Sequence, residues 1–522
     1  SPVLPSPSRL IFLSHCLMTT CERSASTMSY SKLNESDDFS DEVKPTALPP
    51  ILRRALFVAV FSLAVFAFRD VRWQRHWTPN ESRDFVPNES MCYATCKLRV
   101  AESLPTSLSI GQPRFSTYEA WKRLIMRAKS DLVIAAYKSS LQGKHVLGDL
   151  HEKFSPEGDH IYELLLSRGL KDNLTIHMVE NYPPKDKGDN EDAMLLHEEG
   201  AVDRRYLTIS EIMGRGMMHS KFLLADNKSF YLGSANLDWR SLNQKFELGV
   251  FVENCPCLGR DLRRIYDAYE DLSHGTQLDK LKIQPALYNM EHPLKMVIEG
   301  APSSVYIASS PPRLNNIGRT HDLTAILHTI NSAKKFVYVH VMDYFPLYVY
   351  REPRKHWGAL DDAIRDAVLR GVEIKILTAA LHYPELITSY LRSLQALDHF
   401  TPNASIEARV LKVPAPEGAP IVITRERRTH KKLLVTEDTV VIGNSNWSGD
   451  YFESGTTGAA VVMKQEGESR PLIDDMRANF ERDYESDYAH PVEEYYEKCI
   501  LAKSADFCEG EKDPRLFAKH KS

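Results

Sequence analysis

Two segments, His219-Ser-Lys-Phe-Leu-Leu-Ala-Asp226 and His430-Lys-Lys-Leu-Leu-Val-Thr-Glu437, repeat one pattern in two parts of the chain. Each segment places a histidine two residues before a lysine and an acid five residues after that lysine. A small polar turn follows each one, Gly233-Ser-Ala-Asn236 in the first and Gly443-Asn-Ser-Asn446 in the second. In an extended chain, residues i and i+2 point to the same side, so each histidine should project beside its lysine. Doubled around one pocket, these groups suit a substrate with a phosphodiester at its centre.

The surroundings of the two motifs are duplicated as well. Helix and strand patterns alternate in the first half at 118–129, 131–137, 161–168 and 174–179, and in the second at 325–335, 336–342, 361–370 and 372–377. Strands that alternate with helices predict parallel sheets covered by helices. We therefore expect an α/β protein that arose by internal duplication, with one motif contributed by each half.

The two motifs resemble the signature of the phospholipase D superfamily, and the resemblance spans roughly 92–490. The stretches 233–242, 443–452 and 255–262 are similar to its lysosomal branch, phospholipase D types 3 and 4. That branch is known chiefly for 5′-to-3′ exonucleases, so the resemblance implies two α/β/α halves around one site and single-stranded DNA or RNA as substrate. A transphosphatidylase acting on phospholipid is the alternative, and a catalytically silent membrane glycoprotein is the alternative of another class.

The chemistry expected of the motifs needs no cofactor. One histidine would attack phosphorus and the other would protonate the leaving oxygen and then activate water. We assign the attack to His219 and the acid role to His430, because Glu247 is expected to orient His219, whereas the matching place in the second half holds Thr457. The residues expected to hold the phosphate oxygens are Lys221, Lys432, Asn236, Asn446 and Ser234.

Other residues near the motifs have less certain roles. Asp226 and Glu437 belong to the signature, but at about 3.3 Å per residue they lie some ~20 Å past the histidines and should stabilise the hairpin turns. The second motif leaves open whether Asn444 or Asn446 donates to phosphate. Tyr344 and Phe345, at the end of a strand, are either base-stacking rings or packing at the edge of the core.

The N-terminal region predicts a membrane topology. We expect a disordered cytoplasmic tail at 1–50, a transmembrane signal anchor at 51–69 and a lumenal stem at 70–107, followed by halves at 108–295 and 296–495 and a tail at 496–522. A cleaved signal sequence and a core helix are the alternatives for 51–69. Arg53 and Arg54 would stay cytoplasmic, which places the body in the lumen of the endoplasmic reticulum, Golgi, endosome and lysosome, with a soluble form released from the membrane as one outcome.

Cysteines and sequons agree with a lumenal body. Cys92 and Cys96 are expected to bridge to Cys255 and Cys257, with a zinc site as the competing interpretation, and Cys499 is expected to pair with Cys508. The sequons expected to carry glycans are Asn80, Asn88, Asn173, Asn227 and Asn403.

Composition sets the remaining bounds. The chain has 522 residues, 43% hydrophobic and 26% charged, which is typical of a globular protein with ample core. A formal net charge of −5 is unusual for a protein that reads long duplexes. A small basic pocket in such a surface suits a single strand or a lipid headgroup equally. A homodimer is compatible with the sequence, which does not define the oligomeric state.

Overall fold

The computed structural model describes residues 86–172, 174–186, 188–380 and 383–503. These residues belong to one compact unit. The predicted tail and anchor lie outside the described residues. In the part of the chain that is described, no helix is long and apolar enough to cross a bilayer.

The first sheet is mixed. Its strand order is β1 (Lys97–Ser103), β9 (Lys245–Glu253), β7 (Ser229–Gly233), β6 (Phe222–Ala225), β2 (Asp131–Ala136), β4 (Thr175–Asn181) and β5 (Asp203–Leu207). Only β2, β4 and β5 run parallel to one another, and the other neighbours are antiparallel. The short strand β17 (Arg428–Thr429), from the second half of the chain, pairs with β9.

The second sheet repeats this plan. Its order is β10 (Leu294–Ile298), β11 (Ala301–Ser310), β20 (Gly458–Gln465), β19 (Thr439–Gly443), β18 (Lys432–Thr436), β12 (Phe336–Val341), β15 (Glu373–Thr378), β16 (Ser405–Leu411) and β21 (Ala489–Pro491). From β11 to β16 the strands match β1 to β5 one for one in order and direction. The expectation of parallel sheets holds only for β2, β4 and β5 and their counterparts β12, β15 and β16, because each motif strand returns through a tight hairpin and such hairpins join antiparallel strands.

The predicted helices flank the predicted strands. The longer helices are α4 (Thr117–Arg127), α7 (Pro156–Lys171), α11 (Pro256–Ser273), α12 (Asp322–Ser332), α13 (Ala359–Leu369), α14 (Pro384–Gln395) and α17 (Pro471–Tyr484). In α4, the Ser116 hydroxyl accepts from the Glu119 N–H at 3.0 Å and so caps the first turn. The helix then buries Ala120, Trp121 and Leu124, which share one face at helical spacing.

Shorter elements connect these layers. They are α3 (Glu89–Thr95), α5 (Lys144–Leu147), α6 (His151–Phe154), α8 (Glu191–Glu198), α9 (Ile209–Met213), α10 (Trp239–Asn243), α15 (Ile421–Glu426), α16 (Gly449–Phe452), α18 (Val492–Tyr495), β3 (Ser139–Ser140), β8 (Leu237–Asp238), β13 (Leu347–Tyr348) and β14 (Lys355–His356). Two disulfides, Cys92–Cys257 and Cys96–Cys255, tie α3 to the start of α11. The zinc interpretation is therefore wrong. Cys499 is also disulfide-bonded, and Cys508 lies outside the described residues.

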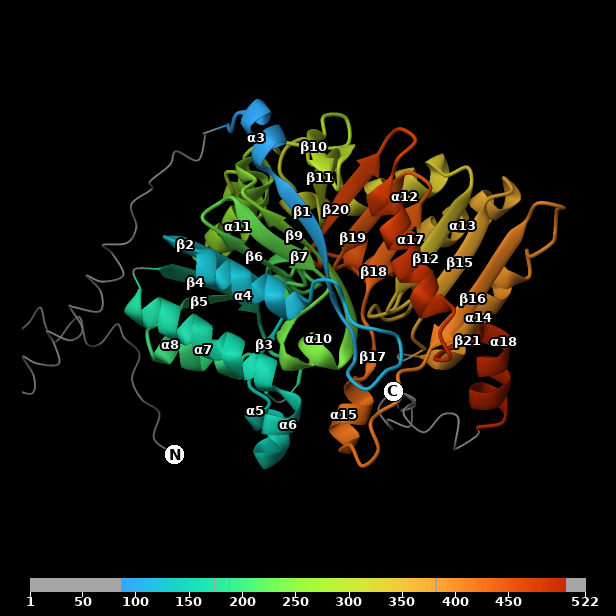
Figure 1. Cartoon of the computed structure of the whole chain (residues 1–522), viewed down its shortest axis with the longest axis horizontal. Coiled ribbons are helices and arrows are strands. Elements are labelled where there is room, and N and C mark those ends of the chain that lie inside the picture. The colour runs from blue at the N-terminus through green and yellow to red at the C-terminus, as the bar shows by residue number, and fades with distance from the viewer. Residues whose placement is uncertain (1–85, 173, 187, 381–382, 504–522) are drawn as a thin grey trace, which may run out of the picture. The chain divides into compact units, whose positions relative to one another are not determined.

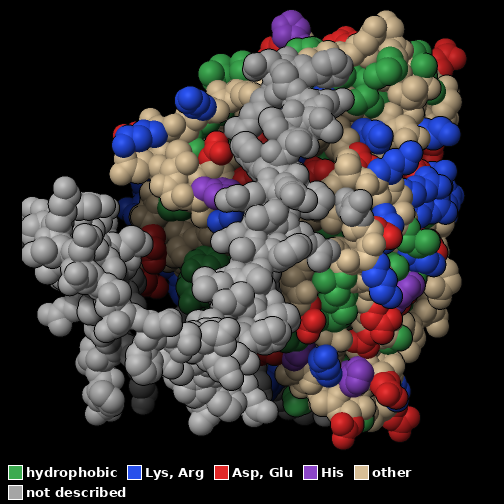
Figure 2. All heavy atoms as spheres, turned by 90° about the vertical axis from the view of Figure 1, so that its left-hand side faces the viewer, with side chains coloured by type: hydrophobic (Ala, Val, Ile, Leu, Met, Phe, Trp, Pro, Cys, Tyr) green, Lys and Arg blue, Asp and Glu red, His purple; other side chains and the backbone are tan. Residues whose placement is uncertain are grey.

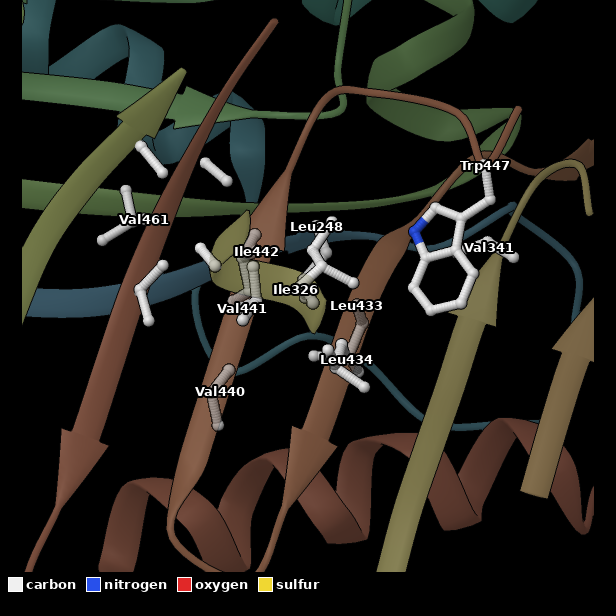
Figure 3. Close-up of a cluster of buried hydrophobic side chains, with 14 of the residues drawn as sticks. Leu248, Ile326, Val341, Leu433, Leu434, Val440, Val441, Ile442, Trp447 and Val461 are labelled. Atoms are coloured by element: carbon white, nitrogen blue, oxygen red, sulfur yellow. The ribbon is translucent and has the colours of Figure 1, made fainter. Parts of the chain in front are cut away.

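The two sheets meet through one apolar core. β7 and β9 of the first sheet lie against β19 and β20 of the second (Figure 1). Leu248 of β9 packs among Val441, Ile442 and Leu433 of the second sheet, all of them buried (Figure 3). The first sheet also begins inside the predicted stem of 70–107, because β1 is one of its strands. The two halves are therefore joined along β7, β9, β19 and β20, close to where both motifs begin.

Candidate active site

Both motifs present their histidine and lysine from one side of an extended segment. Lys221 Nζ donates to the carbonyl of His219 at 2.7 Å, and Lys432 Nζ donates to the carbonyl of His430 at 2.8 Å. All four side chains are buried. The residue between each pair points away, where Ser220 Oγ lies 2.9 Å from the hydroxyl of Tyr269. The extended geometry that the spacing predicts is present in both copies.

Each half holds the histidine of the other. The backbone N–H of His430 donates to the carbonyl of Phe246 at 2.8 Å, next to the pairing of β17 with β9. In the opposite direction, Thr457 Oγ1 accepts from the N–H of His219 at 2.9 Å and from the N–H of Ser220 at 3.1 Å. The two motifs therefore converge because the chain segments cross between the sheets.

This crossing changes the expected partner of Glu247. Glu247 Oε2 lies 2.7 Å from His430 Nδ1, so the carboxylate serves His430, and the expectation that it orients His219 is wrong. The hydroxyls of Ser234 and Ser241 donate to the same carboxylate at 2.5 and 2.7 Å. His219 Nδ1 is buried and has no hydrogen-bond partner among the described residues.

The second half has no counterpart of this carboxylate. Gly233 pairs with Gly249 in the first sheet and Gly443 pairs with Ala460 in the second, so the register matches Glu247 with Gly458 and not with Thr457. A Cβ at Gly458 would lie 2.1 Å from Ser445 Oγ, so the packing there excludes a side chain. The two halves are unequal, as expected, but the residue in the place of Glu247 is Gly458 and not Thr457.

Two asparagines place amide groups in the site. Asn236 and Asn446 occupy the same position after their turn glycines and are both buried, and the Oδ1 of each lacks a partner among the described residues. Asn444 Oδ1 accepts from the N–H of Ala459 at 2.9 Å, whereas its buried Nδ2 donor has no partner among the described residues. Ser234 accepts from the N–H of Leu248 at 3.0 Å and donates to Glu247, so it supports the carboxylate and is not set to hold phosphate. A buried amide N–H without a partner is costly unless a ligand satisfies it, and an anion can accept from such a donor but cannot satisfy an amide oxygen.

The electrostatics of the site favour an anion. Burial, followed by the nearby lysines, lowers the pKa of both His219 and His430. Burial also lowers the pKa of Lys432 to about 7, against the opposing pull of Glu247. Burial raises the pKa of Glu247. A bound phosphodiester anion would offset these costs by stabilising the charged lysines and one imidazolium.

Aromatic rings bracket His219. The ring centroids of Tyr137 and Tyr451 each lie 4.9 Å from that of His219. Of the two interpretations of Tyr344 and Phe345, core packing holds and base stacking does not. Tyr344 is buried with its hydroxyl donating to Asp361 at 2.7 Å, and Phe345 is buried in the same core. Tyr137 lies at the end of a strand, as Tyr344 does, so its position in the sequence could have identified it. No sequence pattern pointed to Tyr451, which lies in a helical turn.

The motif acids lie outside the site. The carboxylate of Asp226 accepts from the N–H groups of Lys129, Ser130 and Asp131, just before β2. Glu437 accepts in the same way from the N–H of Lys334 at 2.7 Å and from that of its neighbour, just before β12. Neither acid is placed for a catalytic role, and each anchors the start of the adjacent strand to the hairpin, as their distance from the histidines along the strand predicts.

Three of the predicted glycosylation sites can be located. Asn88 and Asn403 are exposed, and Asn227 is half-buried in the turn after β6. Asn88 also caps α3, since its Oδ1 accepts from the N–H of Ser90 at 2.9 Å. Asn80 and Asn173 lie outside the described residues.

Comparisons with known proteins agree with this geometry. Residues 108–416 match the family model described as "PLD3/4, PLD-like domain". The chain is 36% identical over 454 residues to the rat protein named "5'-3' exonuclease PLD3" and 35% identical over 454 residues to the human one, each match covering 83% of this chain and 89% of the relative. A Caenorhabditis elegans protein named "Probable phospholipase D F09G2.8" is 31% identical, covering 86% of this chain and 78% of that protein.

A solved structure is similar in fold. The phosphatidylserine synthase of Haemophilus influenzae aligns over 82% of this chain and 96% of its own, with a TM-score of 0.50 and 11% identity. That likeness concerns the fold alone. The family model and the relatives together show that the chain belongs to the phospholipase D superfamily, in the branch that contains the PLD3 and PLD4 proteins.

Proposed function

We propose that the protein is a phosphodiesterase that removes nucleotides from the 5′ end of single-stranded DNA or RNA without a metal ion. The observation that carries the chemistry is the pair of converging His–Lys motifs, in which, within the described part of the chain, only His430 has a carboxylate partner. The substrate is taken from the relatives, which are named 5′-3′ exonucleases and share about a third of their residues with this chain.

The first step forms a covalent intermediate. A ring nitrogen of His219 attacks phosphorus, and the bond from phosphorus to the leaving sugar oxygen breaks. His430 gives a proton to that oxygen, so the strand leaves as an alcohol. Lys221 and Lys432 balance the charge on the other phosphate oxygens, with the amides of the two buried asparagines beside them.

The second step releases the product. Water attacks the phosphohistidine and gives its proton to His430, and the bond from phosphorus to His219 breaks. The division of roles no longer rests on a carboxylate beside the nucleophile, because Glu247 lies on His430, where it stabilises the imidazolium that an acid must carry. Burial lowers the pKa of both histidines, so the two differ in this carboxylate, and His219, whose Nδ1 has no partner among the described residues, is the neutral nucleophile of the proposal.

The membrane topology is part of the same proposal. Residues 51–69 would anchor the chain with its body in the lumen, and the disulfides Cys92–Cys257 and Cys96–Cys255 suit that oxidising compartment. Figure 2 shows basic and acidic side chains mixed over the uncovered part of one face.

Digestion of end-labelled single-stranded DNA at pH 5 in EDTA tests the proposal. Free and blocked 5′ ends are compared, and His219→Ala serves as the control. Stepwise loss from free 5′ ends only, abolished in the variant, is the expected result. Intact DNA with a folded protein would contradict it and would favour phosphatidyl transfer between lipids, which the same intermediate permits with an alcohol as acceptor.

A further inference from the structure

Three tyrosines lie at one edge of the first sheet, where its three parallel strands end. Tyr137 directly follows β2, Tyr182 directly follows β4 and Tyr206 is the second-last residue of β5. The strands are neighbours in the order β2, β4, β5 and run parallel, so these ends share one edge at spacings of about 4.8 Å per strand. We call Tyr137, Tyr182 and Tyr206 the tyrosine row.

The row starts at the catalytic histidine and becomes more exposed outward. Tyr137 packs on His219 and is half-buried, whereas Tyr182 is 44% exposed and Tyr206 is 53% exposed. The rings of Tyr182 and Tyr206 contact each other at 4.8 Å between centroids, and the N–H of Tyr182 donates to the carbonyl of Leu207 at 2.9 Å. Asn181, just before Tyr182, accepts from the N–H of Met218 at 3.0 Å, which fixes this strand end beside the first motif.

Cations accompany both ends of the row. Lys221 Nζ lies 5.1 Å from the ring centroid of Tyr137, and the guanidinium of Arg204, which also pairs with the buried carboxylate of Glu180, lies 5.8 Å from that of Tyr206. Lys185, three residues beyond Tyr182, is close enough for its charge to lower the pKa of His219. Rings that alternate with basic groups along a line are the features that bind single-stranded nucleic acid without sequence preference.

The described residues of the second half have no aromatic ring at the matching positions. Register matches Tyr137 with Met342, Tyr182 with Ala380 and Tyr206 with Val410. These three residues are all buried. Packing of a duplicated fold therefore does not require aromatic rings at these strand ends, and the three tyrosines are a feature of the first half.

We propose that the tyrosine row is a binding track on which successive bases of the single strand stack as it leaves the catalytic site. This inference rests on the proposed function and adds a direction to it: the strand beyond the scissile phosphodiester runs over the C-terminal ends of β2, β4 and β5. Because stacking uses the faces of the rings, the track accepts any base.

The test compares substrates of different length. The double variant Tyr182→Ala/Tyr206→Ala is measured against wild type on a dinucleotide and on an octanucleotide with the same 5′ end. For wild type, we expect a KM for the octanucleotide about tenfold below that for the dinucleotide. The longer strand can stack its bases on the tyrosine rings, and such stacking strengthens binding by at least this factor. The variant is expected to lose this advantage, whereas Tyr182→Phe/Tyr206→Phe keeps it.

Controls separate the possible failures. Tyr93→Ala removes a tyrosine of matched exposure on α3, 48%, and should keep the length dependence. An unchanged length dependence in the double alanine variant, or an equal loss on both substrates, would overturn the track. A shift of that variant from dimer to monomer in sedimentation would instead make the row a protein interface. If wild type neither binds nor cleaves the octanucleotide but hydrolyses a small phosphodiester, the proposed function fails with the track.

Discussion

The two halves share a strand order but treat their histidines differently. Glu247 of the first half lies 2.7 Å from the ring of His430 through its carboxylate. In the other direction, the second half provides only the hydroxyl of Thr457, which accepts from the backbone N–H of His219. Gly458 stands where a second carboxylate would be. Duplication alone would give two equal histidines, and in the proposed mechanism this difference separates a neutral nucleophile from a proton donor.

The halves also differ behind the motifs. In the first, Ser220 Oγ meets the hydroxyls of Tyr269 and Thr457 in a neutral network. In the second, Lys431 Nζ donates to Glu102 and Asp483 at 2.6 Å each. The second motif is therefore anchored by buried charge and the first by neutral hydrogen bonds, although both anchors lie one residue from a catalytic histidine.

The largest effect is expected from that buried charge. Lys431→Met would leave Glu102 and Asp483 buried without their lysine, and we expect a loss of about 3–5 kcal/mol in the free energy of unfolding. Ser220→Ala, the matched change in the first half, should cost about 1 kcal/mol. Urea unfolding measures both, and equal losses would contradict the difference between the anchors.

This anchor should survive in an acidic compartment. Burial raises the pKa of Glu102, but Lys431 and Arg482 lower it more, to about 2. Its folded-state pKa therefore lies below the unfolded value, so its contribution to stability is present above about pH 4.5 and is lost as the pH falls toward 2. In Lys431→Met the lysine that lowers the pKa of Glu102 is gone, and burial raises the pKa of Asp483. These carboxylates therefore take up protons more readily in the folded variant, and its loss of stability in urea unfolding should be smaller at pH 5 than at pH 7.

Removal of the Glu247 carboxylate should have the second-largest effect. Glu247→Gln is expected to lower kcat by about 100-fold, because orienting partners of catalytic imidazoles have effects of that size. Thr457→Ala should lower it several-fold at most, since its hydroxyl touches the backbone of His219 and not the ring. Steady-state kinetics on single-stranded DNA decide the point, with thermal unfolding as the control for folding. A larger loss in Thr457→Ala would reverse the comparison.

Both lysines should lose their charge as the pH rises, because burial lowers the pKa of Lys221 well below its usual value and that of Lys432 to about 7. The Lys432 side chain is therefore charged at pH 5 and largely neutral at pH 8. We expect kcat/KM to fall about tenfold from pH 6 to pH 8 as the charge that holds phosphate disappears. Lys432→Arg, which stays charged, should move that fall to higher pH. A shift caused by Lys221→Arg instead would assign the titration to the first half.

The smallest effect is expected at the motif acids. Asp226→Asn and Glu437→Gln remove charge from groups that accept backbone N–H bonds near the surface. Each should lower the free energy of unfolding by about 1 kcal/mol and leave kcat within about twofold of wild type. Parallel unfolding and kinetic measurements check this, and a selective loss of kcat would restore a catalytic role to the acids.

Local sequence pattern predicted much of this molecule. The helix and strand ranges followed from periodicity, and the convergence of His219 and His430 followed from the repeated motif. The partner of Glu247 could not be predicted, because it depends on β17 crossing from the second half to pair with β9. Burial of Tyr344 and partial exposure of Tyr137 likewise depend on neighbouring elements, since both residues occupy similar strand ends.

Accumulation of the covalent intermediate tests the unequal roles of the two histidines most directly. With a 4-nitrophenyl phosphodiester as substrate, the 4-nitrophenolate leaves phosphorus without help from an acid. His430→Asn should therefore release one 4-nitrophenolate per enzyme in a burst and then stall for lack of a base to activate water. Mass spectrometry of the quenched variant should find the phosphoryl adduct on His219, and His219→Asn should give no burst. An adduct on His430, with a burst in His219→Asn and none in His430→Asn, would contradict the account.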